Sequence, residues 1–98
     1  MRLTILPAAR ADLIEIGDFI AADNPARALS FVAEIEARMA KIADMPGASL
    51  GRDELHPGLR SVRHGRYGIF FMADEGAGEV RVVRVIHDAR DLGAVFAG

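Results

Sequence analysis

The spacing of apolar residues divides the chain into a helical first half and a strand-rich second half. Apolar positions that recur every three or four residues predict one helix from Ala8 to about Ala22 and a second that starts at Pro25. Asn24 suits the N-cap of the second helix, and Met45-Pro46-Gly47 ends it. Because the link between them is so short, the two helices should form an antiparallel hairpin. The stripe positions predicted to pack into the core are Leu13, Ile16, Ile20, Val32, Ile35, Met39 and Ile42.

The second half predicts strands. Two apolar, β-rich runs, Tyr67 to Ala73 and Val80 to His87, flank a glycine-containing turn and indicate a β-hairpin. Leu59 to His64 predicts a further strand, and Arg2 to Leu6 predicts a short strand at the sheet edge. The order β-α-α-β-β-β defines a single α+β domain over residues 1–98. In this fold a helical hairpin packs on one face of a small, mainly antiparallel sheet.

Strict alternation along the hairpin strands predicts which side chains share a face. Both faces are apolar, and such strands are normally covered on both sides. One helical hairpin covers only one face of the sheet, so the other face is predicted to be a partner surface. Residues 46–58 are predicted to form a loop that is ordered by Leu50 and Leu55. The predicted groupings are Tyr67, Ile69 and Phe71 opposite Phe70 and Met72, and Val80, Val82, Arg84 and Ile86 opposite Arg81, Val83, Val85 and His87.

Composition narrows the class of protein. The 12 basic and 14 acidic residues give a formal net charge of −2, which argues against general nucleic-acid binding. The absence of cysteine excludes thiolate chemistry, and the histidines lack metal-ligand spacing, so no metal or cofactor is predicted. No apolar run approaches the roughly 20 residues of a membrane span, and no secretory signal pattern is present. We therefore expect a cytoplasmic protein without membrane association.

Arginine carries nearly all of the positive charge, and it is concentrated where the sheet begins. Residues 56–73 contain Arg60, Arg63 and Arg66 and no carboxylate. This side chain suits planar, multidentate contacts, although a GC-rich genome produces the same bias. No nucleophile motif and no glycine-rich phosphate loop is present, so binding is favoured over catalysis. The acidic residues of the first helix, expected to face solvent or the helix start, are Asp12, Glu15 and Asp18.

Several short motifs, in this order along the chain, resemble the ParE branch of the RelE/ParE toxin superfamily. They are Asp12-Leu13 with Ile16, Asn24-Pro25-Ala26, Met45-Pro46-Gly47, Gly65-Arg66-Tyr67, Val85-Ile86-His87 and Ala89-Arg90-Asp91-Leu92. Each motif is weak alone, but together they cover nearly the whole chain. The resemblance implies the fold derived above, a type II toxin-antitoxin system and DNA gyrase as the target. It also implies a ParD-like antitoxin that wraps the toxin in a hetero-oligomer.

Two binding surfaces and no catalytic residue are predicted. The antitoxin should dock as a helix in a groove, with or without an added extended segment, and its acidic side chains should meet arginines of the sheet. The target should contact the C-terminal segment, which combines charge with an apolar anchor. No specific DNA contact by this chain is expected. The antitoxin-binding residues are predicted to be Arg60, Arg63, Arg66, Tyr67, Arg81 and Arg84, and the target-binding residues His87, Arg90, Leu92 and Phe96.

Two alternatives stay open. A RelE-like, ribosome-dependent messenger RNA endonuclease needs proton-transfer groups and cations near the scissile phosphate. At the positions where the resemblance places such groups, this chain has Gly68 and Phe96, which cannot transfer protons. The second alternative is a decayed toxin that only binds its antitoxin and modulates the antitoxin's DNA binding.

Overall fold

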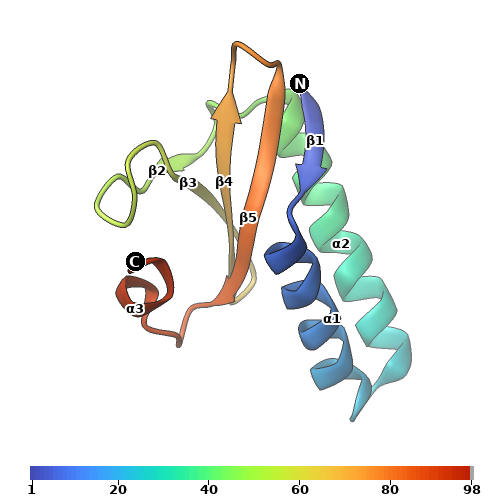
Figure 1. Ribbon diagram of the computed structural model, residues 1–98. Coiled ribbons are helices and arrows are strands. Elements are labelled where there is room, and N and C mark those ends of the chain that lie inside the picture. Colours follow the sequence, from blue (N-terminus) through green and yellow to red (C-terminus); the bar gives the residue numbers. More distant parts are fainter. Residues whose placement is uncertain (98) are drawn as a thin grey trace.

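The computed structural model describes residues 1–97 and confirms the predicted α+β fold (Figure 1). Each predicted helix and strand is present, with ends within about two residues of the expected ones. Two further short elements follow the main helices. In chain order the elements are β1 (Arg2–Ile5), α1 (Pro7–Ala21), α2 (Pro25–Asp44), β2 (Leu50–Gly51), β3 (Arg60–His64), β4 (Tyr67–Asp74), β5 (Glu79–His87) and α3 (Leu92–Phe96).

The strands form one sheet in the order β1-β5-β4-β3-β2. Strand β1 pairs with β5 in parallel, and all other neighbours are antiparallel. The helical hairpin connects β1 at one edge of the sheet to β2 at the other, and the chain then returns through β3 and β4 to place β5 beside β1. This places β1 at the sheet edge, as the sequence predicts, and puts β5 and β4 in the middle.

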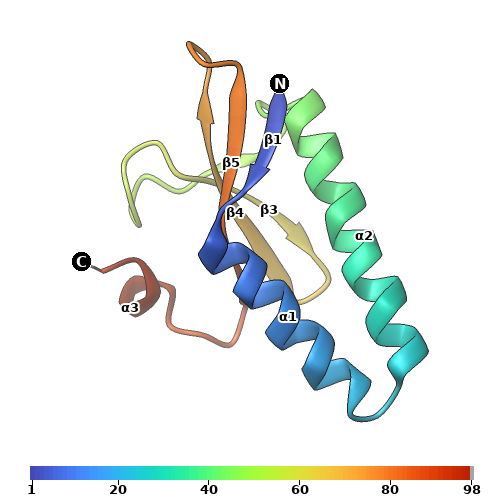
Figure 2. The same cartoon turned by 45° about the vertical axis from the view of Figure 1, so that its right-hand side comes forward.

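Helices α1 and α2 run antiparallel and cover one face of the sheet (Figures 1 and 2). The Asn24 side chain caps α2 by accepting a hydrogen bond from the Arg27 backbone N–H at 3.0 Å. Of the predicted core residues, Ile20 is only partly buried, and Val32 lines the outer side of the hairpin. Neither helix, nor α3, is long and apolar enough to cross a membrane. The core beneath the hairpin contains Ala9, Leu13, Ile16, Ile35, Met39, Ile42, Ile69, Phe71, Val80, Val82 and Val85.

A β-bulge in β5 changes which of its side chains face the helices. Phe70 pairs with Arg84 and Phe71 with Val82, so Val83 is an extra residue on β5. The alternation resumes one position later. The prediction that Ile86 shares a face with Val80 and Val82 is therefore wrong, and so is the placement of Val85 on the opposite face. Val85 packs beneath the helices, and Ile86 packs on the other face of the sheet.

That other face is partly covered by the chain itself, through helix α3, which the sequence did not predict, and through the loop of residues 46–58, which it did. Helix α3 supplies Leu92, Val95 and Phe96, which pack against a second buried cluster of Leu59, Phe70 and Ile86. The loop contributes Leu55 to the same cluster. In contrast, Leu50 lies in the two-residue strand β2 and is 65% exposed, so its predicted role in ordering the loop is wrong. The open apolar sheet face expected from the sequence is thus much reduced.

We predict that Ile35→Asp lowers the free energy of unfolding by about 4 kcal/mol or more, because it buries an unpaired charge in the core. Ile35 is fully buried in the central cluster. Ala37→Asp is the matched control, because Ala37 is exposed on the same helix. Chemical denaturation measures both variants, and equal stability of the two would show that the helix packing is wrong.

Candidate partner-binding surfaces

An ion pair between buried Asp12 and half-buried Arg84 joins helix α1 to the interior strand β5. The Asp12 carboxylate accepts hydrogen bonds from Arg84 Nε at 2.8 Å and Nη2 at 2.9 Å, and from the Val85 backbone N–H at 2.8 Å. Hydrogen bonding to Asp12 raises the pKa of Arg84 above its ordinary value. Asp12 is only 9% exposed, so the expectation that it faces solvent is wrong. Arg84 is accordingly paired within the chain.

Two more of the predicted antitoxin-binding arginines are also held by the chain. Arg81 donates to Glu79 Oε1 at 2.7 Å and to Asp74 Oδ2 at 3.0 Å. The hydrogen bond to Glu79 is the main cause that raises the pKa of Arg81. Arg60 donates to the Ser49 hydroxyl at 2.6 Å and to the Ser49 carbonyl at 2.9 Å. The guanidinium groups of Arg60 and Arg81 bind neighbouring parts of the chain, so each has fewer N–H donors left for a partner.

The remaining two arginines lie exposed at the β3–β4 end of the sheet. Arg63 pairs with Asp88 at 2.6 Å, yet its side chain is 68% exposed. Arg66 is exposed in the tight turn, next to Gly65, whose φ of +58° lies in the left-handed region that favours glycine. Within residues 1–97 the Arg66 side chain has no ion-pair partner. This end of the sheet therefore offers cationic groups to a binding partner.

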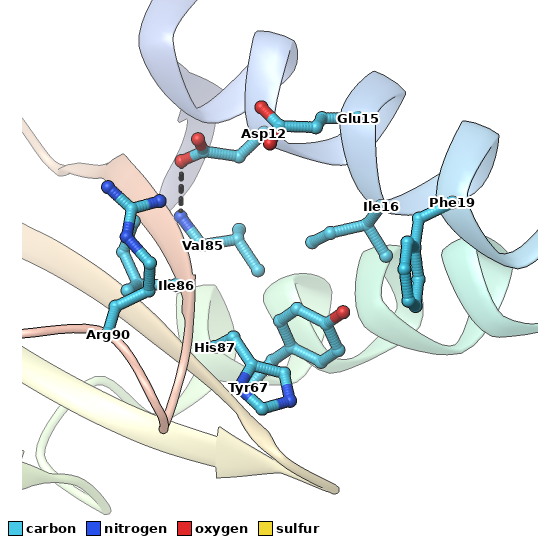
Figure 3. Close-up of a pocket in the computed structure, with 9 residues that line it drawn as sticks. All are labelled: Asp12, Glu15, Ile16, Phe19, Tyr67, Val85, Ile86, His87 and Arg90. Carbon is cyan, nitrogen blue, oxygen red and sulfur yellow. Dashed lines mark hydrogen bonds between the residues drawn. The ribbon is translucent and has the colours of Figure 1, made fainter.

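Tyr67, His87 and Arg90, predicted for two different surfaces, come together in one pocket of about 310 Å³ between α1 and the end of β5 (Figure 3). The Tyr67 and His87 rings pack edge to face, with centroids 5.1 Å apart. Burial, and to a lesser degree the nearby Glu15 carboxylate, raises the pKa of Tyr67. Sequence reasoning missed the contribution of Phe19, which also lines the pocket and is 76% exposed. The signal available in the sequence was Phe19 itself, a large aromatic residue outside the apolar stripe of the first helix.

Leu92 and Phe96 do not join this pocket. They pack on the opposite sheet face, where the Phe96 and Phe70 ring centroids are 5.0 Å apart. The Phe70 ring also lies over Gly68, where an added Cβ would come within 2.8 Å of a ring carbon. The predicted target-binding set is thus split into a polar half at the pocket, His87 and Arg90, and an apolar half on α3, Leu92 and Phe96.

A second pocket, of about 270 Å³, lies beside Gly68 on this opposite face. Arg52 and Arg63 bring positive charge to it, and the Arg52 guanidinium lies 5.4 Å from the centroid of the Phe70 ring. Its acidic residue is Asp88, which already binds Arg63. Among residues 1–97 no histidine lines this pocket, Tyr67 does, and both arginines are paired within the chain, Arg52 with Glu54 and Arg63 with Asp88.

A third hollow follows the outer side of the helical hairpin. It is a groove of about 550 Å³ between α1 and α2, bordered by Ile14 and Leu29. These side chains are 61% and 77% exposed, and both border the same groove, so together they form an exposed apolar patch. The sequence analysis missed this groove because it followed only the apolar stripes that face the core.

Comparison with known proteins identifies the class to which this fold and these surfaces belong. Residues 3–92 match the model of the family described as the ParE toxin of the type II toxin-antitoxin system, parDE. The chain therefore belongs to the ParE toxin family, as its motifs indicated. It is a ParE-type toxin of a type II toxin-antitoxin system. A search of curated proteins finds no match.

Solved structures show the same fold. A chain of the chromosomal ParDE toxin-antitoxin system from P. aeruginosa superposes with a TM-score of 0.74 at 23% sequence identity, covering 89% of this chain and 95% of that one. A chain of the toxin-antitoxin complex RelBE2 from Mycobacterium tuberculosis superposes with a TM-score of 0.64 at 26% identity, covering 91% and 92%. The RelE/ParE-like architecture is thereby confirmed.

We predict that Asp12→Ala lowers the free energy of unfolding by about 3 kcal/mol, because it leaves the Arg84 guanidinium and the Val85 N–H without their acceptor. Asp18→Ala is the control, since Asp18 is an exposed carboxylate on the same helix outside the pocket of Figure 3. Its expected effect is within about 0.5 kcal/mol. Urea denaturation of the two variants decides the matter, and a small loss for Asp12→Ala would mean that the ion pair contributes little.

Proposed function

We propose that this toxin inhibits DNA gyrase by binding to it, without cleaving RNA, and that a ParD-like antitoxin neutralises it in a cytoplasmic hetero-oligomer. Membership of the ParE family supports the proposal, as does the fold shared with a ParDE system. The observation that carries it is the packing of Phe70 over Gly68 and against Phe96. Gly68 and Phe96 occupy the two positions where the nuclease branch of the superfamily is expected to hold functional groups.

Cleavage of RNA through its 2′-hydroxyl requires a base or acid and a cation that meet at the scissile phosphate. Here the space above Gly68 is filled by an aromatic ring, and a side chain at this position would collide with it. Phe96 is partly buried in the second core cluster. Arginines lie near, but the neighbouring carboxylate of Asp88 binds Arg63. The site therefore favours recognition over catalysis.

The surface proposed for gyrase is the pocket formed by Tyr67, His87 and Arg90 together with the exposed ring of Phe19. It combines an aromatic anchor with charge at its rim, which is the usual composition of residues that dominate binding energy. Leu92 and Phe96 contribute indirectly, because their packing holds the segment that carries Arg90.

The surface proposed for acidic side chains of the antitoxin narrows to Arg63 and Arg66, with Tyr67 beside them. Arg60, Arg81 and Arg84 bind groups of the toxin itself, so they act mainly in the fold. Arg63 can exchange Asp88 for a partner carboxylate at small cost, because exposed ion pairs contribute only about 0–1 kcal/mol.

The target is tested with purified, antitoxin-free protein in two assays. We expect inhibition of supercoiling by gyrase and no cleavage of ribosome-bound messenger RNA. Codon-positioned RNA cleavage with intact supercoiling would instead assign the chain to the nuclease branch, to which the RelBE2 likeness points. Antitoxin binding with neither activity would identify a decayed toxin.

The gyrase surface is tested by charge reversal at its rim. Arg90→Glu should reduce inhibition of supercoiling at least tenfold, because the reversal replaces attraction by repulsion, and like-charge contacts across an interface cost several kcal/mol. Arg10→Glu is the control, because Arg10 is an exposed arginine on α1 outside the pocket. Substitution is preferable to removal of α3, which would uncover Leu59, Phe70 and Ile86. Equal inhibition by both variants would place the target contact elsewhere.

A further inference from the structure

The segment that leads from β5 to α3, residues 88–91, carries Arg90 into the pocket proposed for gyrase. Arg90 is exposed and lines that pocket. Within residues 1–97 its guanidinium forms no hydrogen bond or ion pair, so its position depends on the backbone that carries it. Packing of α3 on the second buried cluster fixes the far end of the segment. The direction of Arg90 therefore depends on what fixes the near end.

Asp88 joins the near end of the segment to the turn between β3 and β4. Its backbone N–H donates to the Arg66 carbonyl at 2.8 Å, one residue beyond the end of β5. Its carboxylate accepts a hydrogen bond from Arg63 Nη2 at 2.6 Å. The same guanidinium donates through Nε to the Gly65 carbonyl at 2.9 Å. Arg63 therefore connects the backbone of the turn to the side chain of Asp88.

A tight turn passes this position on to Arg90. The Arg90 backbone N–H donates to the His87 carbonyl at 3.0 Å and closes a four-residue turn, in which Asp88 is the second residue. A turn of this length leaves the backbone little freedom between its ends. A fixed Asp88 therefore determines the direction in which the Arg90 side chain leaves the segment.

His87 does not hold the Asp88 carboxylate. The Ala89 backbone N–H donates to His87 Nδ1 at 3.0 Å, so Nδ1 is an acceptor and carries no proton in this arrangement. Asp88 Oδ1 lies 3.3 Å from Nδ1 but finds no donor there. Among the side chains of residues 1–97, Arg63 is thus the one that binds this carboxylate by a hydrogen bond.

We propose that Asp88 is a positioning residue of the gyrase-binding surface: through Arg63 it holds the segment that presents Arg90 to the pocket. The proposal deepens the proposed function and rests on its assignment of this pocket to gyrase. The described residues that line the pocket include neither Asp88 nor Arg63, which lie at the second pocket on the opposite face of the sheet. Their effect on the target should therefore pass through Arg90.

The free toxin tests the positioning without any target. NMR relaxation of the backbone amides of residues 89–91 should give order parameters of about 0.85, the value of a rigid backbone. Asp88→Asn keeps the size of the side chain but removes its charge, and the order parameters should fall toward about 0.6. Asp91→Asn is the matched control, because it removes the same charge from the same segment while asparagine still caps α3. Equal rigidity of the two variants would overturn the proposal.

Inhibition of supercoiling shows whether Asp88 acts through Arg63 and Arg90. Asp88→Asn should weaken inhibition about fivefold, the upper range for an exposed ion pair, whereas Asp91→Asn should leave it unchanged. Arg63→Gln should have the same effect as Asp88→Asn, and the two together should cost no more than either alone, because both remove one bond. In a protein that already carries Arg90→Ala, Asp88→Asn should have no further effect. A full loss in that background would reveal general structural damage and overturn the proposal.

The outcomes separate this inference from the proposed target. A toxin that does not inhibit gyrase, but whose residues 89–91 lose order in Asp88→Asn, would support the positioning of Arg90 and overturn the gyrase proposal. Inhibition of gyrase with unchanged order in Asp88→Asn would overturn the positioning alone. Effects of Asp88→Asn and Arg63→Gln that multiply to about 25-fold would also overturn it, since independent effects indicate separate contacts with the target.

Discussion

The carboxylate of Asp12 is the interaction on which the rest of the structure depends. This buried carboxylate accepts two hydrogen bonds from the Arg84 guanidinium and one from the Val85 backbone N–H. It therefore ties the first helix to strand β5, 72 to 73 residues later in the chain. A domain of this size has a total stability of about 5–15 kcal/mol, and loss of one partner in a buried pair costs roughly 3–5. The position of the helical hairpin on the sheet therefore depends heavily on one side chain.

The same group explains the irregularity of β5. The bulge adds Val83 to the strand and turns the backbone, so the Val85 N–H points to Asp12 as Val85 enters the core. A residue later, Ile86 faces the opposite side of the sheet, where it anchors α3 through the second cluster. One local departure from the β ladder thus divides a doubly apolar strand between two cores and sets the direction in which the chain continues toward Arg90.

The sequence predicted the helices, the β-hairpin and the edge strand because their signals are local. These signals are the apolar stripes of the helices, Asn24-Pro25 at the start of the second helix, and the glycines of the hairpin turn. It failed where the decisive contact is distant in sequence. No local pattern shows that Asp12 would bind Arg84, or that a bulge would reverse Ile86. The two-residue strand β2 and the one-turn helix α3 are too short to leave a periodic signal. The binding residues stay a prediction, and in the sequence the arginines that the fold already satisfies, Arg60, Arg81 and Arg84, could not be told from exposed ones.

Internal pairing of most sheet arginines has a consequence for specificity. With Arg60, Arg81 and Arg84 engaged within the chain, Arg63 and Arg66 are the predicted antitoxin-binding arginines that stay exposed. A partner that binds this end of the sheet has two exposed guanidinium groups to match, because the other three already have acceptors within the chain. Specificity then depends on the position of a few charges, and a partner that brings its own cations to Arg63 and Arg66 is penalised by repulsion as well as by missing contacts.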